Sequence, residues 1–372
     1  MDLACDLHLH SAFSIATSPR MLPGPILLAC RRKGLGAVGS GDALLPGWRA
    51  AWERCRERGS GTLVVPSAEV EDRDRIHHLI LMEDFSGFAS LQEAFSVHSR
   101  DLLTTGRPRV RLSGEEIARS VHARGGLVGP AHAFTPWTSL YARYDTPAGA
   151  YGAEPVDFLE LGLSADSSYG AAVPELYAIP FLSHSDAHSP DPASCGREFS
   201  VLSVREVTVP GVLEAISRGG VVMNAGLFPE EGKYNRTACS RCYRQFGAGE
   251  AAALSWRCPD DGGRIKKGVL DRSRELSTGA ARTRPPYLHT IPLVQVIQRV
   301  LGVSSPRTRG VQALYDRFLD QFGDEIRVLA GAAPGDLAAV HPGVAGAVRA
   351  LREGRVLLTA GGGGRYGSFA FP

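Results

Sequence analysis

Short apolar runs, each ending in a polar residue, recur along the first two thirds of the chain. They cover residues 4–10, 35–42, 63–69, 77–82, 126–132, 156–163, 180–188 and 220–224. Runs of this length, bounded by turn-forming residues, are typical of buried strands. Helical periodicity between them predicts helices over residues 24–33, 113–124 and 209–217. Seven or eight alternating units in about 225 residues predict an α/β fold with a mainly parallel sheet, closed into a distorted barrel.

The last part of the chain has a different pattern. Residues 279–286 are rich in Gly, Pro and Arg and predict a linker, and the Gly-rich residues 361–364 predict a loop. Helical periodicity follows the linker at residues 293–301, 311–322 and 344–352, and the glycines that would end these helices are Gly302, Gly323 and Gly354. The predicted domains are therefore residues 1–225, 226–285 and 286–372.

The run at residues 6–10 carries the first candidate chemistry. Strand side chains alternate between faces, so Asp6, His8 and His10 share one side while Leu7 and Leu9 share the other. A buried polar row needs a partner, and two imidazoles one alternation apart suit a divalent metal. A half-exposed strand with two surface histidines is the alternative at this stage.

Further residues of ligand type fall at the ends of the other strands, where barrel enzymes carry their chemistry. The predicted metal ligands are His8, His10, Asp42, Glu69, His77, His132, Asp186 and His188. These are too many for one ion, so we expect two or three divalent metals, with Glu69 or Asp186 as a bridging carboxylate. His184 shares the face of Asp186 and His188 and is a candidate to orient a ligand. Paired metals are the usual equipment for phosphate-ester hydrolysis, although amide hydrolases also use them.

Cysteine usage and charge narrow the setting. Of seven cysteines, only Cys239, Cys242 and Cys258 cluster, which argues against a disulfide framework and favours a reducing compartment. The N-terminus does not resemble a signal peptide, and no apolar stretch approaches the roughly 20 residues of a membrane span, so we expect a cytoplasmic protein.

The basic residues are unevenly distributed. Residues 232–285 hold twelve Lys/Arg and five Asp/Glu, a net charge of +7, whereas the whole chain has +2. A concentrated basic segment is the electrostatic footprint expected for a phosphate backbone. A solvated arginine-rich linker is the alternative.

The motifs together resemble a known family. Asp-Leu-His-Leu-His-Ser at residues 6–11, Pro-Ala-His132 and Ser-Asp-Ala-His188 resemble the PHP (polymerase and histidinol phosphatase) superfamily of metal phosphoesterases. Phe-Pro-Glu-Glu-Gly-Lys-Tyr at residues 228–234 is more specific and resembles the endonuclease Q family, and the resemblance covers nearly the whole chain. It implies a PHP-type distorted (β/α)7–8 barrel, a small zinc-binding module and a C-terminal helical domain. It also implies an endonuclease that incises DNA 5′ to uracil, hypoxanthine, xanthine and abasic sites.

The resemblance also implies roles for individual residues. Asp186 and His132 would act as metal ligands or proton handlers, and the barrel metals would be zinc, manganese or magnesium. The expected partner is the double-stranded DNA of the nucleoid that contains deaminated or abasic nucleotides. We expect no membrane partner. We expect Lys233 to contact a phosphate. We also expect aromatic residues such as Trp137, Phe228 or Tyr234 to line a pocket for an extruded base. Core packing is the alternative for each aromatic residue.

Two departures from the family pattern matter. Leu45 stands where the family has a histidine, which leaves the number of barrel metals open. In the cysteine module the predicted zinc ligands are Cys239, Cys242, Cys258 and Asp261, with the carboxylate in place of a fourth thiolate. Three thiolates and a carboxylate can hold zinc tetrahedrally, and a metal-free remnant is the alternative.

Two other functions remain as alternatives at this stage. A non-catalytic DNA-binding protein on a degenerate PHP scaffold would account for Leu45 and Asp261. A PHP phosphoesterase acting on a small molecule would have no use for the basic module.

Overall fold

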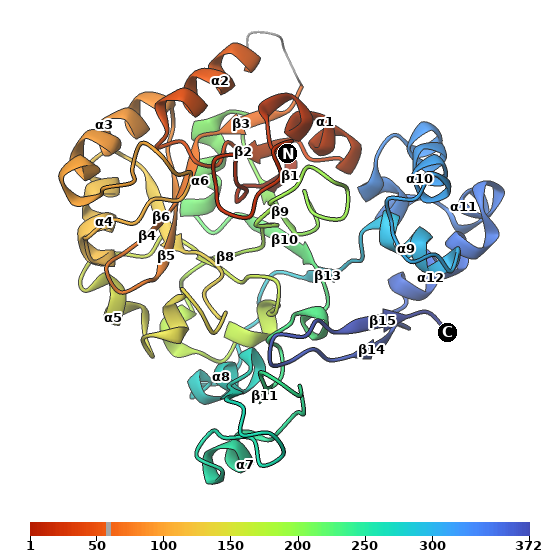
Figure 1. Cartoon of the computed structure of the whole chain (residues 1–372). Coiled ribbons are helices and arrows are strands. Elements are labelled where there is room, and N and C mark those ends of the chain that lie inside the picture. The colour runs from red at the N-terminus through yellow and green to blue at the C-terminus, as the bar shows by residue number, and fades with distance from the viewer. Residues whose placement is uncertain (57–60) are drawn as a thin grey trace.

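The computed structural model describes residues 1–56 and 61–372 (Figure 1). The strands of the first part are β1 (Asp2–Asp6), β2 (Ala37–Gly39), β3 (Leu63–Val65), β4 (Ser67–Glu71), β5 (His77–Leu81), β6 (Leu127–Pro130), β7 (Leu159–Glu160), β8 (Phe181–Leu182), β9 (Phe199–Ser203) and β10 (Val221–Gly226). Its helices are α1 (Pro23–Lys33), α2 (Pro46–Arg56), α3 (Phe85–Phe95), α4 (Gly114–His122), α5 (Pro147–Tyr151) and α6 (Val209–Ser217).

The remaining elements form the cysteine module and the C-terminal part. The module contains β11 (Ala238–Cys239), α7 (Ala248–Ala253), β12 (Ile265–Lys266) and α8 (Val269–Leu276). They are followed by β13 (Tyr287–His289), α9 (Leu293–Val300), α10 (Arg309–Phe322), α11 (Pro334–Val340), α12 (Pro342–Arg352), β14 (Leu357–Thr359) and β15 (Ser368–Ala370). The module hangs below the strands and the C-terminal helices lie to one side (Figure 1).

The strands are divided among several sheets of mixed direction. The largest has the order β13-β10-β9-β1-β2-β3, in which β9 runs antiparallel to both of its neighbours. Strands β4, β5 and β6 form an antiparallel sheet, and β7 pairs with β8 in parallel. The prediction of a mainly parallel sheet was therefore wrong.

A tight turn explains the antiparallel pairing of β4 and β5. The Asp72 side chain accepts hydrogen bonds from the backbone N–H groups of Asp74 and Ile76, both at 2.8 Å, and Arg75 has φ 64°. These local hydrogen bonds reverse the chain direction within a few residues, so β5 pairs antiparallel with β4. A parallel pair would need a long crossover connection.

Backbone contacts join the sheets into an interrupted ring. Asp157 N donates to Val128 O at 3.1 Å between β6 and β7, and Leu9 bridges in parallel to Ala187 beyond β8. The α/β fold with a cysteine cluster and C-terminal helices is as predicted, but the strands form no single continuous parallel barrel within residues 1–56 and 61–372.

Local signals account for several helix ends. Helix α4 begins at a capping box in which Ser113 accepts from Glu116 N and the Glu116 carboxylate accepts from Ser113 N. The predicted glycines Gly302, Gly323 and Gly354 follow α9, α10 and α12 with φ of 64°, 90° and 67°. Left-handed backbone after a helix favours glycine, so these three predictions are confirmed.

The buried side chains form separate cores. One surrounds the sheets and includes Trp48 and Trp52, a second lies among α9–α12, and a small cluster lies in the cysteine module. The predicted linker at residues 279–286 has no regular structure but packs on the first part, because Arg284 donates to the carbonyls of Leu176 and Ile179. Strand β13 joins the main sheet, although the predicted boundary placed it with the helices; the domain bounds stay a prediction.

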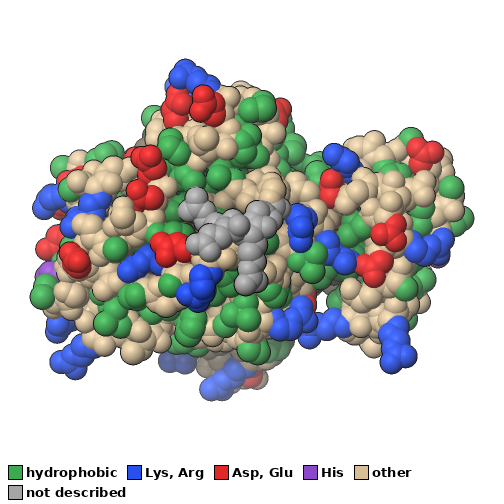
Figure 2. Space-filling model, turned by 90° about the horizontal axis from the view of Figure 1, so that it is seen from above, with side chains coloured by type: hydrophobic (Ala, Val, Ile, Leu, Met, Phe, Trp, Pro, Cys, Tyr) green, Lys and Arg blue, Asp and Glu red, His purple; other side chains and the backbone are tan. Residues whose placement is uncertain are grey.

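The C-terminal helices form a lobe beside the sheets, and Lys and Arg side chains border the junction between the two in the view from above (Figure 2). A cleft of about 610 Å³ lies at this junction, with Arg20, Arg32 and Arg307 among its lining residues. Among the described residues, no helix combines the length and apolar character that crossing a membrane requires.

Candidate metal centre

Strand ends bring the predicted ligands together. His8 and His10 follow β1, His132 follows β6, and Asp186 and His188 follow β8. Glu69 lies within β4, and His77 is the first residue of β5. Because β5 runs antiparallel to β4, its first residue lies at the same edge as the last residues of β4. The hairpin that contradicted the parallel sheet thus delivers one of the ligands.

Three overlapping groups of ligand atoms result. They are His8/His10/Glu69, Glu69/His77/His132 and His10/Asp186/His188, and the ligand atoms within each group lie within 4.8 Å of one another. Glu69 belongs to two groups: its Oε1 lies 2.8 Å from His77 Nδ1 and 3.1 Å from His132 Nε2, and its Oε2 lies 3.4 Å from His10 Nε2. Glu69 is therefore common to two of the groups, and the role of Glu69 or Asp186 as a bridging carboxylate stays a prediction.

Several of these atoms are buried without a hydrogen-bond partner in the described part of the chain. They are His8 Nε2, His10 Nε2, His77 Nε2 and Asp186 Oδ1. His10 Nε2 and Asp186 Oδ1 lie 3.0 Å apart but are not aligned for a hydrogen bond. An unpaired buried polar atom costs about 1–3 kcal/mol, and a cation held by several such atoms removes that cost. The donor set of imidazoles and carboxylates fits divalent metals.

The electrostatics of the pocket point the same way. Burial alone would lower the pKa of His8, but the carboxylates of Glu160 and Glu69 raise it to about 9. Burial alone would raise the pKa of Glu69, but His77 and His132 hold it well below its usual range. The carboxylates are therefore ionised, and the pocket favours positive charge, which a divalent cation supplies.

Glu160 was not assigned a role from the sequence, yet it positions three parts of the centre. Its carboxylate lies 2.9 Å from His8 Nδ1 and 3.0 Å from His184 Nδ1, and it accepts from His132 N at 2.8 Å. His184 therefore contacts Glu160 and not a ligand directly. Glu160 is the last residue of β7 and lies inside the predicted run 156–163, so a carboxylate at a strand end was a signal that could have identified it.

Asp42 lies outside the three groups. Its carboxylate accepts from Ser11 N at 2.8 Å and from Ser14 Oγ at 2.9 Å, and its Oδ1 lies 3.2 Å from His10 Nδ1. Asp42 thus orients the ligand His10, and the other seven predicted ligands converge. Leu45 packs in the hydrophobic core and is 5% exposed.

The backbone is strained at three of these positions. Asp42, His132 and Asp186 have φ of 46°, 34° and 47°, in the left-handed region that non-glycine residues rarely adopt. Each such residue costs about 1–3 kcal/mol and persists only where its surroundings hold it. All three follow strands at the metal centre, where a sharp change of direction aims the side chain inward.

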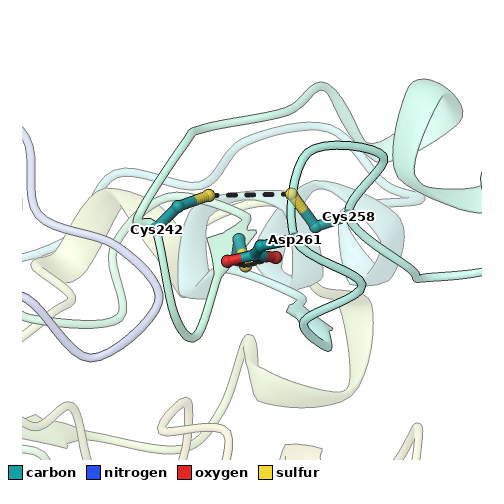
Figure 3. A group of neighbouring side chains, drawn as sticks. Cys242, Cys258 and Asp261 are labelled. Atoms are coloured by element: carbon teal, nitrogen blue, oxygen red, sulfur yellow. Dashed lines mark hydrogen bonds between the residues drawn. The ribbon is translucent and has the colours of Figure 1, made fainter.

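The cysteine module forms a second candidate site (Figure 3). The ligand atoms of Cys239, Cys242, Cys258 and Asp261 lie within 4.8 Å of one another. Cys242 Sγ lies 3.6 Å from Cys258 Sγ, and Cys239 Sγ lies 3.3 Å from Asp261 Oδ1. The four side chains converge from the end of β11, the turn that follows it and the loop before β12, a donor set that suits a tetrahedral zinc ion.

The predicted substrate-binding residues are only partly together. Trp137 lines a cavity of about 430 Å³ between the segment after His132 and the cysteine module, with Lys266 Nζ 3.9 Å from the centre of its ring. Tyr234 meets Trp137 edge to face at 6.1 Å, and Lys233 Nζ lies 5.4 Å from the Tyr234 ring. Phe228 instead stacks on His289 at 4.7 Å and packs against the C-terminal core, away from the cavity-lining residues.

Comparison with known proteins places the chain among its relatives. The family model described as the MJ0043 C-terminal domain matches residues 292–355. The chain is 43% identical to the uncharacterized protein MJ0043 of Methanocaldococcus jannaschii over 246 residues, which is 64% of this chain and 31% of that protein. The chain thus spans about a third of the length of that relative. It is 34% identical to the uncharacterized protein YqxK of Bacillus subtilis over 83% of this chain and 79% of that one.

Two solved structures are similar over the whole length. The lesion-specific endonuclease PfuEndoQ of Pyrococcus furiosus has a TM-score of 0.94 and 42% identity, covering 100% of this chain and 96% of that chain. Endonuclease Q in complex with a 27-mer duplex bearing an abasic lesion at its active site gives the same TM-score and identity, covering 100% and 97%. With this identity over its whole length, the chain belongs to the endonuclease Q family.

Proposed function

We propose that this protein is a metal-dependent DNA endonuclease that incises the phosphodiester 5′ to deaminated bases and abasic sites. The observation that carries the proposal is the convergence of seven ligand-type side chains on the shared carboxylate Glu69, in a chain 42% identical to endonuclease Q throughout. The complex of endonuclease Q with abasic DNA supports a duplex substrate. On this basis we propose that the protein acts on chromosomal DNA in the cytoplasm.

The metal-holding residues we propose are His8, His10, Glu69, His77, His132, Asp186 and His188. Divalent metals (zinc, manganese or magnesium) held by these residues would lower the pKa of a water and neutralise charge on the phosphate. The three groups share residues, which supports two or three ions.

The residues around the ligands prepare the centre. Glu160 fixes the ring of His8 through Nδ1, and Asp42 does the same for His10, so each imidazole presents Nε2 to the site. Asp186 and His188 are the more open members, since their side chains are 29% and 32% exposed while those of His8, His10 and Glu69 are 1% exposed. We infer that the phosphodiester approaches from the side of Asp186, which with His132 holds metal or moves protons.

Basic and aromatic surfaces support DNA binding. The cavity lined by Trp137 also holds Trp256, Arg264 and Lys266, a combination suited to stacking a base and holding phosphate. We propose that Trp137 and Tyr234 line a site for an extruded base and that Lys233 contacts a phosphate. Phe228, which stacks on His289 and packs against the C-terminal core, is not part of this proposed base site.

The other functions are not favoured. A decayed scaffold would not keep strained backbone at Asp42, His132 and Asp186, or buried ligand-type atoms without hydrogen-bond partners at His8, His10 and Asp186. A phosphoesterase for a small molecule would not need the C-terminal helices and the basic module, which the endonuclease Q structures share over their whole length.

A nicking assay tests the proposal. We expect the protein to cut a uracil- or abasic-containing duplex, and chelation or Asp186→Asn to abolish cutting. Asp336→Asn, at an exposed position on α11, is the matched control and should cut normally. Full activity of Asp186→Asn, or no incision by the wild type with any of the three metals, would refute the scheme.

DNA affinity provides a second readout of the same proposal. Asp186→Asn should still bind the lesion duplex, and adding Lys233→Ala should weaken binding and reduce the slope of log affinity against log salt by about one. An unchanged slope would count against a phosphate contact by Lys233.

A further inference from the structure

A loop between η1 (Ser96–His98) and α4 reaches the metal centre and is held there tightly. Gly106 N donates to Phe13 O at 3.2 Å, and a Cβ at Gly106 would lie 1.9 Å from Asp42 Oδ2 and 2.2 Å from Ser14 Oγ. Only glycine permits this approach, because any side chain would displace the residue that orients His10.

The same loop is fixed on the far side of Arg107. Glu71 N donates to Pro108 O at 3.0 Å, and Val110 N donates to Glu71 O at 2.8 Å. Arg107 is therefore held between the Asp42 side of the centre and the end of β4, which carries Glu69. Backbone hydrogen bonds of the residues on either side of Arg107 fix its position in the loop.

The guanidinium of Arg107 touches the shared carboxylate. Its Nη1 donates to Glu69 Oε2 at 3.2 Å, the one hydrogen bond its side chain makes within the described residues. The Arg107 side chain is 29% exposed and Glu69 is 1% exposed, so the guanidinium lies between the buried carboxylate and the solvent. A guanidinium has five N–H donors, which leaves four for another partner.

The Arg107 guanidinium is a cation at the opening of a site whose carboxylates and imidazoles would hold metal cations. Its place there is explained if the site also binds an anion. A phosphodiester is such an anion, and a guanidinium matches its oxygens with paired N–H donors. The Asp186 side chain, which is also 29% exposed, and the Glu71 carboxylate are among the charges near Arg107. The open side of the centre thus presents Arg107 together with Asp186.

We propose that Arg107 is a catalytic residue that binds a non-bridging oxygen of the scissile phosphate and stabilises the charge that develops there. This inference rests on the proposed endonuclease function. Arg107 forms no covalent bond: the oxygen of water bonds to phosphorus, the leaving oxygen departs with the bonding electron pair and takes up a proton, and the guanidinium stays charged. If Arg107 had a purely structural role, it would only keep the Glu69 carboxylate in the position from which it holds metal.

Substitutions at Arg107 separate the two roles. Arg107→Gln should lower the single-turnover rate at saturating DNA by about 100- to 1,000-fold, as loss of an oxyanion donor does. Arg107→Lys should keep part of the rate because it keeps the charge. Metal content per chain and thermal unfolding temperature should match the wild type. Arg109→Gln, an exposed arginine two positions along the same loop, is the matched control and should keep the wild-type rate.

Two further measurements give readouts that a structural role would not change. In the Asp186→Asn background, Arg107→Gln should weaken DNA binding and reduce the salt slope by about one. Methylguanidinium should raise the rate of Arg107→Gly at least tenfold and leave Arg109→Gly unaffected.

The outcomes are distinct. A wild-type rate for Arg107→Gln would overturn the proposal, and so would a loss of rate accompanied by an equal loss of metal, which would assign Arg107 to holding Glu69. If the wild type itself does not incise lesion DNA, the proposed function fails first. In that case an unchanged salt slope for Arg107→Gln would overturn the phosphate contact as well.

Discussion

Replacing Lys33 by methionine should loosen the C-terminal helices from the rest of the chain. Lys33 ends α1, and its Nζ lies 2.8 Å from Glu325 Oε1 and donates to Pro192 O at 2.9 Å. The pair is buried, since the side chains of Lys33 and Glu325 are 4% and 0% exposed. Glu325 also accepts from Leu293 N at 2.9 Å and Tyr315 OH at 2.8 Å, which ties α9 and α10 to the same carboxylate.

The expected cost follows from what remains after the substitution. Lys33→Met leaves a buried carboxylate with two hydrogen bonds and no cation, and removing one partner of a buried pair costs about 3–5 kcal/mol. The two remaining donors place the expected value near the lower end, about 3 kcal/mol. That energy corresponds to roughly a hundredfold rise in the population of the opened form.

Hydrogen exchange measured by mass spectrometry reports this directly, because peptides from α9 and α10 should exchange about a hundredfold faster in Lys33→Met. Peptides from β1 and β2 are the internal control and should change much less. The double variant Lys33→Met/Glu325→Gln, which removes the buried charge, should recover part of the protection. Exchange within threefold of the wild type, or a double variant no better than the single one, would refute the reasoning.

Two other predictions concern buried groups away from the barrel metals. Burial raises the pKa of Glu198 to about 8, and its Oε2 has no hydrogen-bond partner in the described residues. The folded state therefore holds a proton that the unfolded state releases near pH 4.5, so stability should fall as pH rises from about 5 to 8. In Glu198→Gln the urea midpoint of unfolding should depend less on pH over that range than in the wild type. An equal dependence on pH in the two proteins would contradict this. The purified chain should carry zinc in the cysteine module, and Cys258→Ser should lose about one equivalent without losing the barrel metals, so equal zinc content would argue against the site.

The sequence alone determined the elements whose signals are local. Helix α6 was predicted at residues 209–217 and spans Val209–Ser217, because its apolar period and its Thr208 cap lie within one stretch of chain. Seven of the eight predicted ligands converge because each lies in or beside a short apolar run, and most of these runs end at the same edge of the sheets. The motif at residues 6–10 likewise predicts a strand with two histidines on one face from its own sequence.

Only the tertiary structure decided which groups serve those ligands. His8 and Glu160 are 152 residues apart, and Arg107 and Glu69 are 38 apart, so neither contact follows from periodicity. Asp42 stays a predicted ligand, and its contacts with Ser11, Ser14 and His10 come from loops that pack together only in the folded chain. Hydrogen-bond partners are chosen by how sheets and loops pack, and burial then makes each unpaired atom costly. The sequence therefore places the ligands, while packing assigns the residues that orient them.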